Sequence, residues 1–554
     1  MTYEKEIKAY AIKNALDYGK AEPSKILPKM FRHGLEKKEI SKVMPIITKI
    51  CEEINLLSKS ELEKEIKEID KVIVKKEQRK KTLIDNFPKA RGDVITRMAP
   101  EPSKHAHLGH AMSFIINYLF AKQNNGKCFL RFDDCNPEKI KFEYVESIKE
   151  DIENYLGIKY DETKFVSDEM PYLYKKAKEL IEKDYAYMCF CDREKISKLR
   201  REGKGCSCRK NEKLKNLEEW QKFLKGDYID GECILRFKGN MKNKNSVMRD
   251  PVLFRALKGI HYRHKEYKVW PVYDFYSPLM DAFMKISHVF RTKEFDLRLE
   301  LQKELIKIFN LKEYTAIHYG RFNVLDACTK GREIREMIEK KEISGWDDPR
   351  LMTLKALRRR GIKKEVIYEL VNEVGLSKYD VNLDFDKLAS ISRKLFDKEV
   401  RRYYFVQNPV EIDINNLESK DVEIPIQPGS KETRRVKAGK IIIISTDDFD
   451  KNKNKEVRLL HLCNIKLGSN IKEKNICKYT SKEIKKIPKI QWVSSPYSIT
   501  AKIMMPNGSW VNGKAEENIS DLEKGDFIQF ERVGFVRFDK INDEGEYEFR
   551  FAHK

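Results

Sequence analysis

The sequence has no run of about 18 apolar residues, the length that a transmembrane helix needs. Its first twenty residues are charged and contain no apolar stretch of the kind that a secretory signal carries. We therefore expect a cytoplasmic protein that does not contact a membrane. It also has no internal repeat and no long low-complexity tract, so neither a repeat architecture nor a long disordered region is expected.

The cysteine content is equally restrictive. The 11 cysteines are odd in number and lack the even spacing of a small disulfide-bonded domain. Four of them form two short clips, Cys189-Phe-Cys191 and Cys206-Ser-Cys208. Four soft ligands in two clips suit tetrahedral zinc, so the pattern predicts a structural zinc site, with plain reduced thiols as the alternative.

Size and charge point to a large protein with a polyanionic partner. A chain of 554 residues with 41% hydrophobic content is long enough for several cores, so we expect a multidomain protein. Lys and Arg number 111 against 88 Asp and Glu, a formal net charge of +23. Such an excess attracts nucleic acid through its phosphates. Charge alone leaves open the alternative of charged, solvated faces in a lysine- and isoleucine-rich proteome.

Secondary-structure signals change character along the chain. Near the N-terminus, apolar residues such as Leu62, Ile66 and Ile69 recur at helical spacing among Lys and Glu. Strand and helix signals then alternate, and short strands with turn signals follow at the C-terminal end. The predicted regions are 1–90, a helical appendage; 91–325, α/β, with an insertion at 189–265; 326–399, helical; and 400–554, all-β.

The most informative stretch is RMAPEPSKHAHLGHAMSFIIN, residues 97–117. A predicted strand leads through a turn into a helix, and KCFLRFDD predicts the next strand, which makes a β-α-β unit. The first turn of this helix holds His107, Gly109 and His110, and a helix N-terminus favours phosphate. The imidazoles can donate hydrogen bonds to a triphosphate, and Gly109 leaves room for a nucleotide. Alone, a His-x-x-His pattern fits a structural pair or a metal site better.

The complete string resembles the HIGH signature of class I aminoacyl-tRNA synthetases in its glutamyl and glutaminyl form, R-F-A-P-E-P-S/N-G-x-L-H-I-G-H-A. Met98, Lys104 and Leu108 are mild departures from it. Nearly the whole chain resembles the archaeal and eukaryotic type of glutamyl-tRNA synthetase. That resemblance implies a Rossmann-like catalytic domain with an inserted acceptor-stem domain, a helical stem-contact domain, and C-terminal β-barrels that bind the anticodon.

The resemblance also assigns a glutamate pocket. The strand FLRFDDCNPEK is similar to the family's L-R-F-D-D-T-N-P-E-K, whose first acid reads the substrate's α-amino group, here Asp133. The segment KVWPVYDF…HVFRTKEF puts Tyr273 and Arg291 at substrate positions. Glutamate has two carboxylates and each suits a guanidinium, so Arg97 and Arg291 are expected to bind one each. A glutaminyl enzyme would not need Arg291, which favours glutamate.

The ATP site takes residues from two signatures. The second, the KMSKS loop, falls in NVLDACTKGREIREMI, where the match is poor and leaves Lys330 and Arg332 as candidates for the pyrophosphate end of ATP. The residues predicted to bind ATP are Pro100, His107, Gly109, His110, Lys330 and Arg332; those predicted to be catalytic are His107, His110 and Lys330.

Contacts with tRNA are predicted downstream, where SGWDDPRLMTLKALRRRGI is similar to the start of the family's stem-contact domain. Arg350, Arg358, Arg359 and Arg360 would be phosphate contacts there, although arginine runs on helices are often only solvated.

The resemblance thus implies a monomeric glutamate–tRNA ligase that uses ATP with Mg²⁺ and charges tRNA(Glu), with tRNA(Gln) open as a second substrate. It implies that the adenylate forms only with tRNA bound. One alternative is a glutaminyl-tRNA synthetase, which Arg291 argues against. The other is a catalytically degenerate synthetase that only binds tRNA, which the altered loop at Lys330 suggests.

Overall fold

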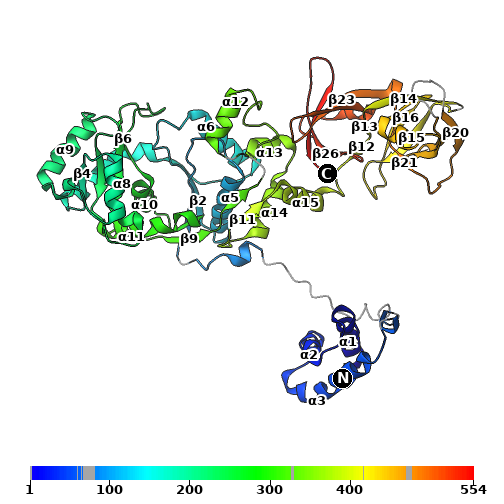
Figure 1. Cartoon of the computed structure of the whole chain (residues 1–554), viewed down its shortest axis with the longest axis horizontal. Coiled ribbons are helices and arrows are strands. Elements are labelled where there is room, and N and C mark those ends of the chain that lie inside the picture. The colour runs from blue at the N-terminus through cyan, green and yellow to red at the C-terminus, as the bar shows by residue number, and fades with distance from the viewer. Residues whose placement is uncertain are drawn as a thin grey trace. The chain divides into compact units, whose positions relative to one another are not determined.

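The computed structural model describes residues 3–58, 60–63, 65, 82–90, 92–325, 328, 330–415, 417–468 and 477–554 (Figure 1). The chain forms two compact units, Met1–Lys81 and Thr82–Lys554. Among the helices in these ranges, none combines the length and the low polarity that crossing a bilayer requires.

The first unit is a small helical bundle. It contains α1 (Glu4–Tyr18), α2 (Pro23–Met30) and α3 (Ile40–Asn55). Their apolar faces bury Ile7, Ile12, Ile26 and Ile47, as the helical spacing predicts. Leu62 is buried with them, whereas Ile66 and Ile69 lie outside the described residues.

The boundary between the units falls earlier than the predicted residue 90. The amide of Leu83 donates a hydrogen bond to Asn372 Oδ1 at 2.8 Å, so the chain from Thr82 onward packs with the second unit.

A parallel sheet forms the centre of the catalytic region. β1 (Ile95–Met98), β2 (Lys127–Phe132) and β3 (Thr163–Phe165) pair in that order, and α5 (Leu108–Gln123) makes the crossover from β1 to β2. The predicted β-α-β unit is therefore confirmed. Its helix begins at Leu108, so His107, expected in the first turn, is the capping residue just before it. β8 (His288–Thr292) pairs in parallel with β9 (Thr315–Tyr319), and the Ser287 amide bonds to Ile95 O at 2.9 Å, so β8 lies beside β1.

An antiparallel sheet interrupts this arrangement. Its strands run in the order β4 (Ala186–Cys189), β5 (Ile234–Phe237), β6 (Val252–Ala256) and β7 (Val269–Pro271). α6 (Phe142–Glu150) packs in the core of the parallel sheet. The helices that follow it are α7 (Met170–Glu182), α8 (Arg193–Glu202), α9 (Lys213–Lys225), α10 (Tyr273–Phe283) and α11 (Leu299–Ile308). The sheet spans the predicted insertion and extends past it on both sides.

Helices dominate the next region. They are α12 (Gly331–Glu339), α13 (Leu354–Arg360), α14 (Lys364–Val374) and α15 (Phe385–Phe396), with β10 (Phe322–Val324) and β11 (Val381–Leu383) paired in parallel. A Thr353 cap starts α13, and a left-handed Gly361 ends it.

The C-terminal part is β-structured, as its turn-rich pattern predicts. One sheet has the order β12 (Arg402–Tyr403), β25 (Phe527–Phe530), β26 (Gly534–Ile541), β27 (Tyr547–His553), β23 (Ser498–Met504), β24 (Trp510–Glu516) and β13 (Phe405–Gln407). A second has the order β21 (Lys489–Ile490), β18 (Glu456–Leu459), β19 (Cys463–Lys466), β20 (Cys477–Ser481), β14 (Pro409–Asn415), β17 (Ile441–Ser445) and β22 (Val493–Ser494). The C-terminal part also contains a separate hairpin, β15 (Lys420–Pro425) and β16 (Thr433–Ala438), and one helix, α16 (Thr446–Lys451).

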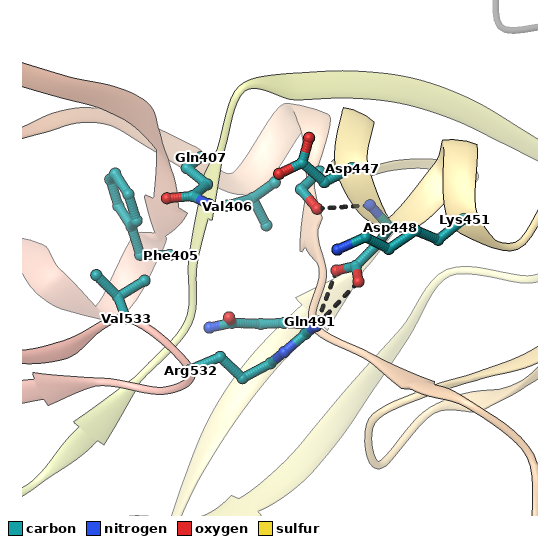
Figure 2. A pocket seen from close by; sticks show the side chains of 10 residues that line it. Phe405, Val406, Gln407, Asp447, Asp448, Lys451, Gln491, Arg532 and Val533 are labelled. Atoms are coloured by element: carbon teal, nitrogen blue, oxygen red, sulfur yellow. Dashed lines mark hydrogen bonds and ion pairs between the residues drawn. The ribbon is translucent and has the colours of Figure 1, made fainter. Parts of the chain in front are cut away.

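Both sheets curl. β12 and β13 stand at opposite ends of one strand order, yet only Tyr404 separates them in the chain, so the sheet must turn back on itself. In the other sheet β21 and β22 likewise stand at opposite ends, and only Gln491 and Trp492 separate them in the chain. Arg532, in the turn before β26, donates to both carboxylate oxygens of Asp448 on α16 at 2.6 and 2.9 Å (Figure 2). This ion pair joins the two sheets.

Candidate active site

A pocket of about 650 Å³ brings together side chains from β1, α5, the segment after β2, α10 and β8. The predicted residues that line it are Arg97, Pro100, His107, Gly109, His110, Asp133, Tyr273 and Arg291. The structure therefore gathers the residues chosen for glutamate and those chosen from the first ATP signature.

A pair of histidines caps α5 at this pocket. The Gly109 amide donates to His107 Nδ1 and the His107 amide donates to His110 Nδ1, each at 3.1 Å. Because both Nδ1 atoms accept, both neutral rings carry their proton on Nε2. Burial, with the Lys104 charge adding to it, lowers the pKa of His110 to about 3 and the pKa of His107 well below its usual value. At neutral pH each ring thus offers an Nε2–H donor.

The backbone of this helix end is less available than the sequence suggests. The Leu108 amide bonds to Met352 O at 3.4 Å, and the His110 amide bonds to His107 O at 2.8 Å. A Cβ atom at Gly109 would meet His107 Cε1 at 3.0 Å, so glycine here makes room for the His107 ring. Imidazole N–H groups, more than backbone N–H groups, are the donors that α5 presents.

Asp281 organises the floor of the pocket beside Arg97 and Asp133, two of the residues predicted to bind glutamate. Its Oδ1 accepts hydrogen bonds from Arg97 Nε at 3.0 Å and from Arg131 Nη1 at 2.7 Å. Arg131 Nε also donates to Asp133 Oδ1 at 2.6 Å. Burial raises the pKa of Asp281, and the two arginines outweigh this and hold it below its usual value. Two guanidiniums and two carboxylates therefore compensate one another in the buried floor, which fixes Arg97 and Asp133 in place.

Arg291 is held by a separate chain of hydrogen bonds. Its Nε donates to His318 Nε2 at 2.9 Å, and its Nη1 donates to Tyr273 Oη at 3.3 Å. His318 can accept at Nε2 only as a neutral ring with its proton on Nδ1, and Nδ1 lies against the Asp296 carboxylate. Burial and the Arg291 charge lower the pKa of His318, which keeps that ring neutral.

One donor of Arg291 remains unsatisfied. The side chain is 4% exposed, and its Nη2 has no hydrogen-bond partner among the described residues. A buried guanidinium N–H without an acceptor is costly, and a ligand carboxylate would satisfy it. The geometry thus prepares Arg291 for an anion in the pocket.

The second ATP signature is arranged differently. Lys330 Nζ pairs with Glu333 at 2.8 Å and its side chain is 78% exposed. Arg332 pairs with Glu336 at 2.8 Å and is 88% exposed. Both lie outside the pocket lining, and their contact with ATP stays a prediction. Of the other predicted loop residues, Ala327 and Thr329 are outside the described residues.

Lys104, which the sequence comparison treats as a mild departure, does line the pocket. Burial lowers its pKa, and its charge in turn lowers the pKa values of His107 and His110. Gly331 packs against it, since a Cβ there would lie 3.2 Å from Lys104 Cδ. Lys104 is thus the lysine that the fold places beside the two imidazoles.

Sequence reasoning missed several further residues of the site. They are Lys104, Arg131, Asp281, Asp296 and His318. Arg131 gave one usable signal, a charged residue inside the otherwise apolar strand FLRF. His318 likewise interrupts an apolar strand, TAIHY. A buried charge implies a buried partner, but its position cannot be read from spacing.

The arginines predicted to contact tRNA differ in availability. Arg350 pairs with Asp348 and Arg358 pairs with Glu150, both near the surface. Arg359 bonds to Asp539 at 2.9 Å.

For Arg360 the prediction needs correction. It is 4% exposed and donates to Ala552 O at 2.9 Å and to Phe551 O at 3.4 Å. Because its guanidinium is buried between α13 and β27, it holds the helices to the C-terminal sheet and is not available to RNA.

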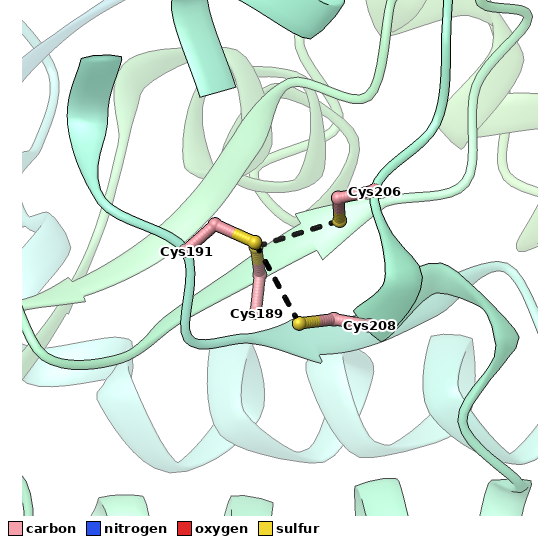
Figure 3. Close-up of side chains that lie close together, drawn as sticks. All are labelled: Cys189, Cys191, Cys206 and Cys208. Carbon is pink, nitrogen blue, oxygen red and sulfur yellow. Dashed lines mark hydrogen bonds between the residues drawn. The ribbon is translucent and has the colours of Figure 1, made fainter. Parts of the chain in front are cut away.

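The two cysteine clips meet as predicted (Figure 3). The Sγ atoms of Cys189 and Cys206, and those of Cys191 and Cys208, are 3.8 Å apart, and all four lie within 4.8 Å of one another. Ligands about 2.3 Å from a tetrahedral zinc stand about 3.8 Å apart, whereas disulfide sulfurs are about 2.05 Å apart. Arg236 Nη1 lies 3.7 Å from the Sγ atoms of Cys189 and Cys206, which favours thiolate. Donor set and distances fit a metal.

Comparison with known proteins gives a consistent result. The family model for the catalytic domain of class I tRNA synthetases (E and Q) matches residues 93–398, and two models for their anti-codon binding domain match residues 400–484 and 489–539. Glutamate–tRNA ligases from Methanocaldococcus jannaschii and Pyrococcus furiosus are 35% and 36% identical, each match covering 100% of both chains. A crystal structure of a glutamate-tRNA synthetase from Elizabethkingia anophelis is 19% identical over 55% of this chain and 70% of that one, with a TM-score of 0.37, too low for a comparison of folds. The chain therefore belongs to the class I tRNA synthetases of the E and Q family.

Proposed function

We propose that this protein is a glutamate–tRNA ligase, which activates glutamate with ATP and transfers it to the 3′-terminal adenosine of tRNA(Glu). The observation that carries the choice of amino acid is the buried, unsatisfied Nη2 of Arg291. A carboxylate supplies the charge and the acceptor that this group needs, whereas a neutral amide supplies less. The full-length archaeal relatives, which are named as glutamate–tRNA ligases, support the same choice.

In this proposal the pocket binds glutamate through four side chains. Arg97 and Arg291 take one carboxylate each, Asp133 accepts from the α-ammonium, and Tyr273 supports the bound amino acid beside Arg291. Asp281 and His318 act through these residues, since they hold the arginines and do not face the substrate directly.

The first chemical step is an in-line displacement. A glutamate α-carboxylate oxygen attacks the α-phosphorus of ATP, the bond to the bridging oxygen breaks, and pyrophosphate leaves. The neutral imidazoles of His107 and His110 donate Nε2–H to the charge that builds on the phosphate oxygens. Mg²⁺ enters with ATP as part of this substrate.

The second step transfers the glutamyl group. The 2′-hydroxyl of the terminal adenosine attacks the adenylate carbonyl, AMP leaves, and a phosphate oxygen can take the hydroxyl proton. The insertion at 189–265 and the helices of 326–399 are proposed to contact the acceptor and inner stems, and 400–554 the anticodon. The net charge of +23 and the family models for an anti-codon binding domain support this.

Aminoacylation of purified tRNA(Glu) and tRNA(Gln), each with glutamate and with glutamine, tests the function. We expect glutamate to be joined to tRNA(Glu) in an ATP-dependent reaction and glutamine to be used poorly with both tRNAs. Glutamylation of tRNA(Gln) would add a second substrate. An enzyme that prefers glutamine would overturn the proposal, and a protein that binds tRNA but charges neither would favour the degenerate paralogue.

We also propose that the four cysteines bind a structural zinc ion. Cys189, Cys191, Cys206 and Cys208 supply four thiolate ligands, and the metal would tie β4 to the segment after α8. The distances between sulfurs support this, as does the nearby Arg236.

Metal analysis should find about one zinc per chain in protein purified without added metal. Cys206→Ser should lose it, because three ligands remain. Cys233→Ser is the matched control, since Cys233 is a buried cysteine directly before β5 that stands outside the cluster, and it should retain zinc. Wild-type protein that charges tRNA while holding no zinc would refute the site.

A further inference from the structure

A second pocket, of about 520 Å³, lies on the insertion beside the cysteine cluster. It is lined by Cys191, Arg193, Ile196, Ser197, Arg200, Arg201, Gly231, Ile234, Ser246, Arg249 and Val252. The residues from α8 recur at intervals of three and four, so they form one face of that helix. We call Arg193, Arg200, Arg201 and Arg249 the arginine pocket.

The charges of the arginine pocket are not neutralised by the protein. In the part of the chain that the structure describes, none of its four guanidiniums forms an ion pair with a carboxylate. Arg200 Nη2 donates to Ser246 O at 2.7 Å, and Arg249 Nε donates to Asn243 O at 2.7 Å. Carbonyl groups orient these side chains and do not neutralise their charge; the nearby Asp250 carboxylate offsets the charge of Arg200 only in part.

One donor is left over here too. Arg200 Nε is buried and has no partner among the described residues. Arg249 Nη1 donates to Arg200 O at 3.2 Å, which keeps these two cationic residues together. Burial, followed by the charges of Arg236 and Arg249, lowers the pKa of Arg200. A multivalent anion would relieve both the repulsion and the unsatisfied donor.

A second pocket lined by arginines differs from the arginine pocket, because most of its guanidiniums pair with carboxylates. The pocket beside β12 is lined by four arginines, Arg401, Arg402, Arg434 and Arg435. The last three each pair with a carboxylate, on Asp397, Glu516 and Glu423 respectively. Those arginines serve the fold. Among the described residues the four guanidiniums of the arginine pocket have no such counterions, so a ligand is the natural source of negative charge.

The position of α8 is fixed at both ends. Asp192 caps its first turn, directly after Cys191, and Cys206 and Cys208 follow its last turn. Ile196, on the same face of α8, packs against the hydrophobic cluster that contains Ile234 and the cysteines. Because the helix is anchored, the backbone positions of its arginines are fixed, and the carbonyl contact of Arg200 also holds its guanidinium, which reduces the entropy lost on binding an anion.

We propose that the arginine pocket binds a phosphate group, supplied by the backbone of a bound tRNA strand. Planar guanidiniums are suited to phosphate oxygens, and several together can hold one phosphate through charge-assisted hydrogen bonds. The RNA source rests on the proposed function, whereas the phosphate chemistry rests only on the side chains. Inorganic phosphate is the other source of the same group.

The test compares two double variants of the full-length chain. Arg193→Gln with Arg201→Gln removes two exposed charges and leaves the carbonyl contacts of Arg200 and Arg249 intact. Lys195→Gln with Lys198→Gln removes two charges from the same helix, at positions outside the pocket lining. Direct binding of tRNA is measured over a range of salt, and inorganic phosphate is titrated in parallel.

We expect the arginine variant to bind tRNA about tenfold more weakly and to lose about one unit of the log–log salt slope, with the lysine variant near wild type. If only phosphate binding weakens in the arginine variant, a phosphate site is supported and the RNA source is refuted. Equal effects in the two variants, or none, would overturn the site. Direct binding needs no catalysis, so a failure to charge glutamate would count against the proposed function alone.

Discussion

Replacing Arg291 by alanine is expected to lower kcat/KM for glutamate in tRNA charging by at least about a hundredfold, or about 2.7 kcal/mol of transition-state binding. The substitution removes the guanidinium whose Nη2 has no partner among the described residues, and so removes the counter-charge for one substrate carboxylate. A buried carboxylate left without its partner typically costs several kcal/mol.

The specificity of this loss is the stronger test. Glutamine presents an amide where glutamate has its second carboxylate, so any residual glutamine charging should fall far less. The melting temperature of the variant checks that the contacts from Arg291 to His318 and Tyr273 are not needed for folding. Equal losses for both amino acids would mean that Arg291 supports the fold or the ATP site.

His318→Gln separates orientation from charge. It keeps Arg291 but breaks the link from Arg291 to Asp296, so we expect a smaller rise in KM for glutamate than Arg291→Ala causes. As a positioning residue, His318 should affect KM more than kcat.

Lys104→Gln is expected to reduce kcat/KM for ATP by about a hundredfold, a loss typical of one donor to a developing oxyanion. Lys104 lines the pocket beside His107 and His110, where the triphosphate is proposed to lie. Lys330→Gln should lower kcat/KM for ATP by no more than about threefold. The Lys330 ammonium is exposed and pairs with Glu333 outside the pocket, and losing such a surface ion pair changes stability little.

The rate of pyrophosphate exchange in the presence of tRNA reports on adenylate formation, and it is measured for both variants. Glutamate KM provides the control, since Lys104 does not belong to the proposed glutamate site. A larger loss for Lys330→Gln than for Lys104→Gln would show that Lys330 reaches the triphosphate in the ATP complex. It would restore the role that the second signature implies.

Much of this protein follows from its sequence. The strand, turn and helix at residues 95–123 can be predicted locally. The alternation of apolar and polar residues, the capping residue and the helical spacing of apolar residues are all visible within a few positions of sequence. The cysteine clips can also be recognised from the sequence, because each clip is a pair of cysteines separated by one residue, and this spacing alone predicts a metal site. Likewise, Arg97, Asp133, Tyr273 and Arg291 belong to strings long enough to carry a family resemblance, and all four line the pocket.

The tertiary structure alone decided which charges are available. Arg131 meets Asp281 across 150 positions of sequence, and Arg360 meets Ala552 across 192. Spacing carries no information about such pairs, because burial and the packing of distant elements determine them. The same reason explains why Lys104 faces the pocket while Lys330 pairs at the surface. It also explains why the arginines of α8 have no ion pair with a carboxylate in the part of the chain that the structure describes. A sequence specifies where its charges stand in the chain, but only the fold determines which of them another part of the protein neutralises.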